Sequence, residues 1–404
     1  MPAATVIPGR HPAQPRPVPP GVGVFSALLG LRGPTPEQFR RMGEALMAGD
    51  EPMDRLVEWI HAVDTDVRRA QFERALASGI DSVADAPEPL REFFEQVETV
   101  PDWVDWDTLR TAAEVMRSGG EDGLYLARDV SLLGGYMYAG FNQTLLRTGA
   151  LEKGSNRRFA ETTRWALDVI AEGGLLPGGV GYRSTLRVRF IHSLVRRHLL
   201  ARPDWDTAEL GLPINQTDMA STLVGALIAP SASSVGLGLF FTPREYESVA
   251  HLTRYVGTLM GVTDEFLPRS FRDSVRVLLH TSCALATPDE TSRLLAAPIA
   301  DDPLTWNYPS LQVMRRRVAR SQHLSIATAF LGRGAMRTLG LPTTVLPWYP
   351  VVRLPVNVCR SIRGMLPGGR AAAAAAGLRR QEMFIRTMVP DEATIGHSAA
   401  ALTG

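Results

Sequence analysis

The sequence predicts an all-α protein organised as a multi-helix single domain. Apolar residues recur three and four positions apart along most of the chain, which is the period of an amphipathic helix. Typical helix starts are present, such as the TPRE sequence at 242–245, in which a threonine cap precedes proline and glutamate. The sequence lacks the sustained alternation of apolar and polar residues that is typical of strands, and it lacks the turn sequences typical of β-hairpins. We expect a flexible Pro-rich leader (1–22), one helical domain (23–390) and a C-terminal tail (391–404).

The expected helices follow one another with short connections. In the first half of the chain, helices are expected from Thr35 onward and over 53–63, 65–79, 89–97 and 108–116. Later helices are expected over 215–228, 242–260, 268–285, 289–296, 311–330 and 370–388. The proline-rich segment 341–360 is not expected to be helical before Val356.

Composition and charge exclude several classes of protein. Of the 404 residues 45% are hydrophobic and 21% are charged, as in ordinary globular proteins. The formal net charge of +1 gives no electrostatic argument for a nucleic-acid partner. The two cysteines, Cys283 and Cys359, are too far apart for a CxxC pair or a CxxCH haem-attachment sequence. The N-terminus lacks the apolar core of a signal peptide, so a cytoplasmic location is expected.

Two glycine-rich or uncharged segments are candidates for lining a site. Segment 121–147 has the length of a helix but contains Gly134, Gly135 and Gly140 among aromatic residues. Such glycines permit close approach of another helix, which is the commoner case, or of a flat ligand. No charged residue occurs in 219–241, but Pro230 divides it into pieces too short to span a bilayer. We expect a buried helix there, followed by a turn.

Segment 156–200 contains the best candidate for a functional site. It is expected to form two helices joined by a Gly/Pro-rich turn. Arg158 and Thr162 lie four positions apart on the first helix, and His192 and Arg196 lie four apart on the second. Imidazole can ligate haem iron, and guanidinium groups can bind haem propionates. Each residue alone also fits a structural role: a core histidine, ion-paired arginines, and a threonine bonded to a backbone carbonyl.

Common catalytic and nucleotide-binding motifs are absent. The sequence has no dinucleotide-binding GxGxxG, Walker A, HExxH or GxSxG motif. His192 and His198 are close in sequence, but a spacing of six puts them on opposite faces of a helix. A metal site shared by the two histidines is therefore not expected.

Several segments in the same order resemble the MpaB/rubber oxygenase family, which includes the latex-clearing proteins. The resemblance covers roughly 100–285 and includes Arg158 with Thr162. It rests further on PDWVDW (101–106), TGAL (148–151), RVRFIHSLVRR (187–197), LPINQTDMASTLVG (212–225) and TPREYESVAHLTRYVGTLMGVTDEFLP (242–268). Each segment alone is weakly specific, whereas their shared order and spacing are fairly specific.

The resemblance implies a globin-like helical core that holds a non-covalent haem b, with additional helices around it. It makes His192 the proximal ligand of the iron and places Arg158, Thr162 and Arg196 near the porphyrin. Latex-clearing proteins are expected to carry a lysine just before that threonine, where this chain has Glu161. A carboxylate cannot replace an amine ligand of iron, which argues against polyisoprene itself as substrate. Glu161 is instead expected to act as a base or to pair with a nearby arginine.

The expected function is therefore a haem b-dependent oxygenase that cleaves or oxidises a C=C bond of a hydrophobic, isoprenoid-like substrate with O2. Two alternatives remain open from the sequence: a non-catalytic haem protein that senses or stores a gas, and a helical isoprenoid- or lipid-binding protein. The expected partners are a small hydrophobic molecule and O2, without nucleic acid or an integral membrane span. The oligomeric state is left open.

Overall fold

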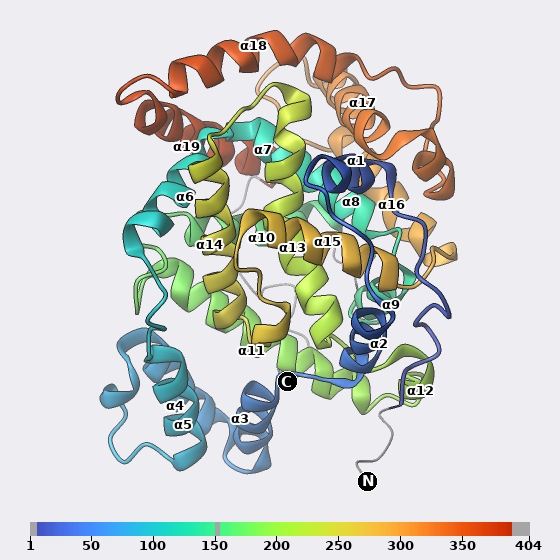
Figure 1. The fold of residues 1–404 in the computed structure, drawn as a ribbon. Helices are drawn as coiled ribbons and strands as arrows, with labels where there is room; N and C mark the ends of the chain where they lie inside the picture. The colour runs from blue at the N-terminus through green and yellow to red at the C-terminus, as the bar shows by residue number, and fades with distance from the viewer. Residues whose placement is uncertain (1–5, 150–153, 390–404) are drawn as a thin grey trace.

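A computed structural model describes residues 6–149 and 154–389, and this part of the chain contains helices but no strand. Figure 1 shows the arrangement of the helices. In the first half they are α1 Pro20–Leu28, α2 Pro36–Glu44, α3 Glu51–Ala62, α4 Thr65–Ser78, α5 Glu88–Glu98, α6 Trp106–Ser118, α7 Gly120–Leu126, α8 Leu133–Gly135, α9 Ala139–Arg147, α10 Ser155–Val169 and α11 Val180–Leu200. The second half contains α12 Thr207–Leu210, α13 Gln216–Ser233, α14 Pro243–Leu259, α15 Phe271–Ala284, α16 Glu290–Asp301, α17 Gln312–Thr338, α18 Trp348–Gly364 and α19 Gly369–Met388. The predicted all-α class is confirmed.

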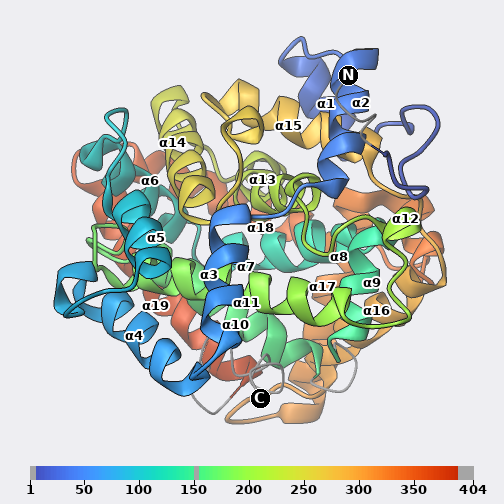
Figure 2. The same ribbon diagram turned by 90° about the horizontal axis from the view of Figure 1, so that it is seen from below.

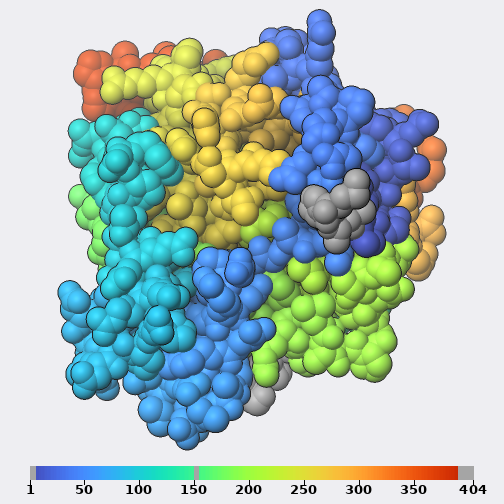
Figure 3. All heavy atoms as spheres, turned by 60° about the horizontal axis from the view of Figure 1, so that its bottom comes forward, coloured from blue at the N-terminus to red at the C-terminus, as the bar shows by residue number. Residues whose placement is uncertain are grey.

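Helix α13 runs through the middle of the molecule (Figures 1 and 2). It packs against α14, α15 and a π-helical segment, Ala127–Leu132. Helices α10 and α11 pack against each other, while α6 contacts both α14 and α19. Helices α3, α4 and α5 form a lobe at one corner, which is attached to the body through contacts of α3 with α11 (Figure 3). The central helices α10, α11 and α13 contain the candidate site.

Local sequence signals set the ends of several helices as predicted. Thr242 Oγ1 accepts a hydrogen bond from the Glu245 amide at 3.3 Å, and the Glu245 carboxylate accepts one from the Thr242 amide at 2.7 Å. This capping box satisfies two amides that the first turn of α14 leaves without helical partners. Thr35 caps α2 in the same way, and α4 ends at Gly79 with φ of 84°. The predicted pair of helices within 156–200 is also confirmed.

Segment 121–147 is broken rather than continuous. α7 passes into the π-helix and the short α8, and α9 starts only at Ala139. The break falls at Tyr136–Tyr138, directly after Gly134 and Gly135, and Tyr138 adopts an extended conformation with φ of −116° and ψ of 94°. Two adjacent glycines weaken the helix, and a π-helical turn is a usual place for the helical hydrogen-bond ladder to change.

Two prolines lie inside helices where the sequence predicted that helices would be absent. α13 continues through Pro230 to Ser233, and α18 begins at Trp348 rather than at Val356. Pro350 occupies the first turn of α18, where an amide has no helical partner in any case. Pro355 removes one internal hydrogen bond and lies on the exposed side, where water can bond the freed carbonyl group. The expectation of non-helical structure up to Val356 is therefore wrong.

The expected leader makes specific contacts along its described part. The amides of Gly9 and Arg10 donate to the carbonyl groups of Ala208 and Glu209, each at 2.9 Å. The Arg10 guanidinium pairs with Asp218 at 2.7 Å, and both side chains are almost fully buried. These contacts do not fit a freely flexible segment. The domain boundaries remain a prediction, and the expected tail (391–404) lies outside the described residues.

One helical stretch of the described chain, Gln216–Leu237, is long and apolar enough to cross a membrane, with a mean hydropathy of 1.4. Its first turn contains the buried polar residues Gln216 and Thr217. Gln216 Nε2 donates to the Gly49 carbonyl at 2.8 Å, and Thr217 Oγ1 donates to the Met42 carbonyl at 2.7 Å. These contacts and the central position of α13 in Figure 1 are typical of a core helix.

Candidate functional site

His192 lies in the second half of α11, and its imidazole forms no hydrogen bond with any described residue. Its Nδ1 atom is buried without a partner, although the side chain keeps some accessible surface. Burial, together with the nearby Arg196 charge, lowers the pKa of His192 to about 4. The imidazole is therefore neutral at pH 7, the form in which histidine ligates a metal.

Polar contacts join α11 to Asp50 and Asp54 on either side of His192. Arg189, one turn before it, binds Asp50 through two hydrogen bonds of 2.6 and 2.7 Å, and both side chains are buried. Ser193 donates to Asp54 at 2.5 Å. Sequence reasoning missed these positioning residues because their partners lie 139 positions away and no motif connects them.

Arg196 belongs to the same network. Its Nη1 atom lies 3.2 Å from Asp54 Oδ1, and its Nη2 atom donates to the Ile214 carbonyl at 3.1 Å. Burial lowers the pKa of Arg196 despite the two nearby carboxylates. The guanidinium thus joins α11 to α3 and to the segment before α13. Its predicted contact with a porphyrin remains a prediction.

Helix α10 carries the other three predicted site residues. The Arg158 side chain hydrogen-bonds Tyr136 at the break before α9, while burial raises the pKa of that tyrosine. Thr162 is exposed, and its hydroxyl donates to the Arg158 backbone carbonyl at 3.0 Å. Glu161 Oε1 lies 3.8 Å from Arg157 Nε on the same helix. Trp165 Nε1 donates to Thr185 Oγ1 at 3.0 Å, which joins α10 to α11.

One face of α13 remains open although the helix is central. Thr222, Gly225, Ala226 and Ala229 recur with the period of one helical face and are not fully buried, unlike Leu223, Val224, Leu227 and Ile228 between them. A Cβ atom built on Gly225 would meet no atom of a described residue within 4 Å, and the same holds for Gly135. A face of small side chains that the described residues leave uncovered would accommodate a flat ligand. Pro230 follows on the same helix.

The described part of the chain offers no metal centre built from several protein ligands. Within residues 6–149 and 154–389, no group of three or more His, Cys, Asp or Glu side chains could hold a metal ion. A lone neutral histidine instead fits a metal that arrives with its own equatorial ligands, as iron does in a porphyrin. The residues present thus fit haem.

The catalytic-domain model described as "ER-bound oxygenase mpaB/B′/Rubber oxygenase" matches residues 123–362. The chain belongs to this family. The match includes α10, α11 and α13, so the candidate site lies within the family's catalytic domain. Ala150 and Leu151 of the TGAL segment lie outside the described residues.

Two relatives support this assignment. The rubber oxygenase of Streptomyces sp. (strain K30) is 24% identical over 203 residues, which is 49% of this chain and 48% of that protein. The match thus spans about half the length of this curated relative. A solved structure of latex clearing protein LCP in the closed state aligns over 89% of both chains, with a TM-score of 0.53 and 17% identity. The structural likeness supports the shared helical fold.

Proposed function

We propose that this protein is a haem b-dependent oxygenase that acts on the C=C bond of a hydrophobic, isoprenoid-like substrate. The neutral, unpartnered imidazole of His192 carries the proposal. It lies on a central helix, and the open face of α13 is made of small residues. Membership of an oxygenase family supports the reaction class.

In this proposal His192 holds the haem iron, and the Asp50–Arg189 and Asp54–Ser193 pairs keep its ring in place. Thr222, Gly225 and Ala226 provide a flat wall without bulky side chains. Arg158 is a candidate for binding a propionate, at the end of α10 that meets Tyr136. When bound, haem supplies the activation of O2 that amino-acid side chains cannot perform.

The same surroundings favour an apolar substrate. The residues of 219–241 are uncharged, and the break and α9 carry the partly buried apolar side chains Met137, Phe141 and Leu145. An apolar lining disfavours water, which would limit side reactions during the oxidation. Glu161 is the proposed base, which takes an allylic proton or orients a water molecule. We also propose a cytoplasmic location.

Reconstitution with haem tests the cofactor assignment. The wild-type protein is expected to give a Soret band and one haem per chain, whereas His192→Ala is expected to lose the band or shift it strongly. His198→Ala is the matched control, since His198 is exposed on the same helix. Full, spectrally unchanged haem binding by His192→Ala would overturn the ligand assignment.

Incubation with alkenes separates an oxygenase from a gas-binding haem protein. The haem-loaded protein is incubated with short isoprenoids under O2, and carbonyl products are identified by mass spectrometry. The wild type is expected to give two carbonyl products, one from each side of the cleaved bond. A stable O2 complex without any product would favour the gas-binding alternative.

A further inference from the structure

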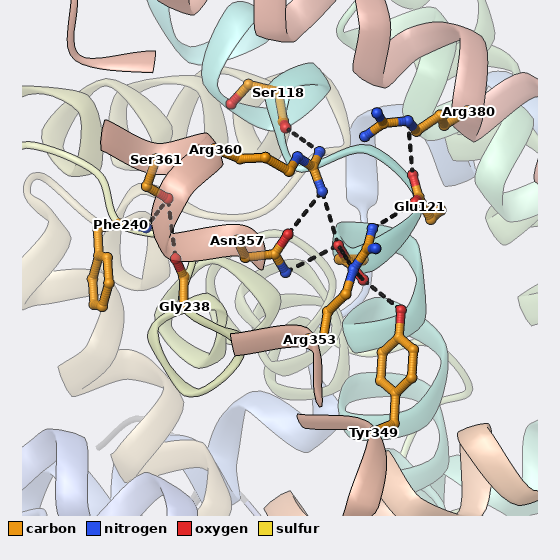
Figure 4. Close-up of polar contacts among 11 residues, drawn as sticks. Ser118, Glu121, Gly238, Phe240, Tyr349, Arg353, Asn357, Arg360, Ser361 and Arg380 are labelled. Carbon is orange, nitrogen blue, oxygen red and sulfur yellow. Dashed lines mark hydrogen bonds and ion pairs between the residues drawn. The ribbon is translucent and has the colours of Figure 1, made fainter. Parts of the chain in front are cut away.

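Helix α18 has its polar and apolar faces reversed relative to the usual surface helix. Its inner face places Tyr349, Arg353, Asn357 and Arg360 on the fully buried carboxylate of Asp122. Figure 4 shows these four side chains converging on one carboxylate from α7, at distances of 2.7 to 3.0 Å. The inner face is thus held by hydrogen bonds to a charge rather than by apolar packing.

The outer face of α18 is apolar. Its large apolar side chains, with those of the turn that follows, are between 43% and 71% exposed; they are Val351, Val352, Leu354, Val356, Ile362, Met365 and Leu366. α18 lies along the upper edge of the molecule in Figure 1, with no other described helix beyond it. An exposed apolar stripe of this length marks a binding surface.

The charge of this part of the chain restricts the occupant. Residues 303–381, which include α17, α18 and most of α19, contain twelve arginines and no aspartate or glutamate. Arg363 is exposed on α18 and forms no salt bridge with a described residue. Arg317, Arg333 and Arg337 on α17 and Arg379 on α19 are also exposed and form no salt bridge with a described residue. The occupant must therefore offer anionic groups together with apolar surface.

We propose that the outer face of α18 docks on the surface of an anionic phospholipid bilayer. Lipid phosphates suit the arginines, and the acyl region just beneath the headgroups suits the valine and leucine side chains. A second copy of this chain fits less well, because the unpaired arginines of the two copies would repel each other. The helix would lie flat rather than span the bilayer, since Asp122 holds its inner face.

The docking is independent of the proposed oxygenase activity but would serve it. α18 contacts the 3-10 turn Ser234–Leu237, which directly follows α13. The end of the central helix therefore lies beneath the docking face. A hydrophobic substrate that partitions into a bilayer would then be concentrated next to the protein that acts on it.

Vesicle flotation with the full-length protein tests the proposal. Vesicles of phosphatidylcholine alone are compared with vesicles containing added phosphatidylglycerol. We expect binding to the anionic vesicles to exceed binding to the neutral ones by about tenfold, and to weaken in high salt. Absence of binding to both kinds of vesicle would overturn the proposal.

Paired variants locate the surface. Val352→Asp with Ile362→Asp is expected to reduce binding about tenfold or more, because two charges would enter the acyl region. Val63→Asp with Val67→Asp changes two equally exposed valines in the α3–α5 lobe and is expected to leave binding unchanged. Likewise Arg363→Glu is expected to weaken binding, whereas Arg55→Glu on α3 is not.

Two further measurements keep the result interpretable. Circular dichroism checks that each variant is folded. We expect all of them to fold, because the altered side chains are exposed. Size-exclusion chromatography with light scattering reports the oligomeric state. A wild-type dimer that Val352→Asp with Ile362→Asp converts to a monomer, without vesicle binding, would assign the face to self-association and overturn the proposal.

Discussion

Glu161 is the position at which a single side chain is expected to decide the chemistry. It lies on α10 one residue before Thr162, and only 11% of its side chain is exposed. If it moves a proton in the reaction, Glu161→Gln should lower kcat by about a hundredfold or more, because the amide cannot accept that proton. The haem spectrum should stay unchanged. Steady-state kinetics with the alkene identified as substrate measures the effect.

Arg157→Gln provides the matched control for Glu161. Arg157 lies 3.8 Å from the Glu161 carboxylate, so its removal disturbs the ion pair but leaves the proposed base. If Glu161 and Arg157 form only a structural ion pair, both variants should show similar, small losses of kcat. That result would exclude the base assignment while leaving the haem assignment intact.

The sequence predicts His192 as a ligand but could not predict the residues that hold its helix in place. Its place at the edge of an apolar stripe was visible from spacing alone. Asp50 and Asp54, in contrast, lie in an early helix whose packing on α11 depends on the tertiary fold. The same limit applies to Arg196, whose spacing from His192 suggested a shared ligand but whose guanidinium contacts Asp54.

At the scale of elements, the attachment of α18 depends on one carboxylate. Asp122 accepts hydrogen bonds from four side chains of that helix and has no exposed surface. Asp122→Asn removes the charge that Arg353 and Arg360 share, and its amide group would point a donor at other donors. We expect a loss of about 3 kcal/mol in the free energy of unfolding. Urea unfolding followed by circular dichroism measures this loss.

Asp107→Asn is the control for that measurement. Asp107 pairs with Arg110 at 2.9 Å on α6, but both side chains are largely exposed. Removing an exposed ion pair is expected to change stability by less than about 1 kcal/mol. Equal effects of the two substitutions would contradict a special role for Asp122 in holding α18.

The two prolines of α18 explain why the sequence underestimated this helix. Each proline removes a local hydrogen bond from a helix, and for this reason no helix was predicted before Val356. This local argument takes no account of the ion pairs that Arg353 and Arg360 form with Asp122, more than 230 positions earlier in the chain. Helices whose ends depend on local signals, such as the capping box at Thr242, were predicted well, because those signals lie within a few residues of one another.

For the molecule as a whole, the helical class followed from periodicity, but the open face of α13 did not. Thr222 and Gly225 appear in the sequence as ordinary small residues of an uncharged helix. Their accessible surface exists because α14, α15 and the π-helix cover other faces of α13. Such a space results from the packing of segments distant in sequence, so spacing along the chain cannot reveal it.

The proposed haem site leads to a prediction about the stability of the whole fold. If haem binds between the central helices as proposed, it binds the folded chain and not the unfolded one. At a free haem concentration of about one hundred times Kd, the free energy of unfolding should rise by about 2.7 kcal/mol. Urea unfolding of the wild type with and without haem measures this rise, and His198→Ala should reproduce it. His192→Ala should lose the rise; an equal rise in that variant would mean that haem binds without the imidazole that the fold presents.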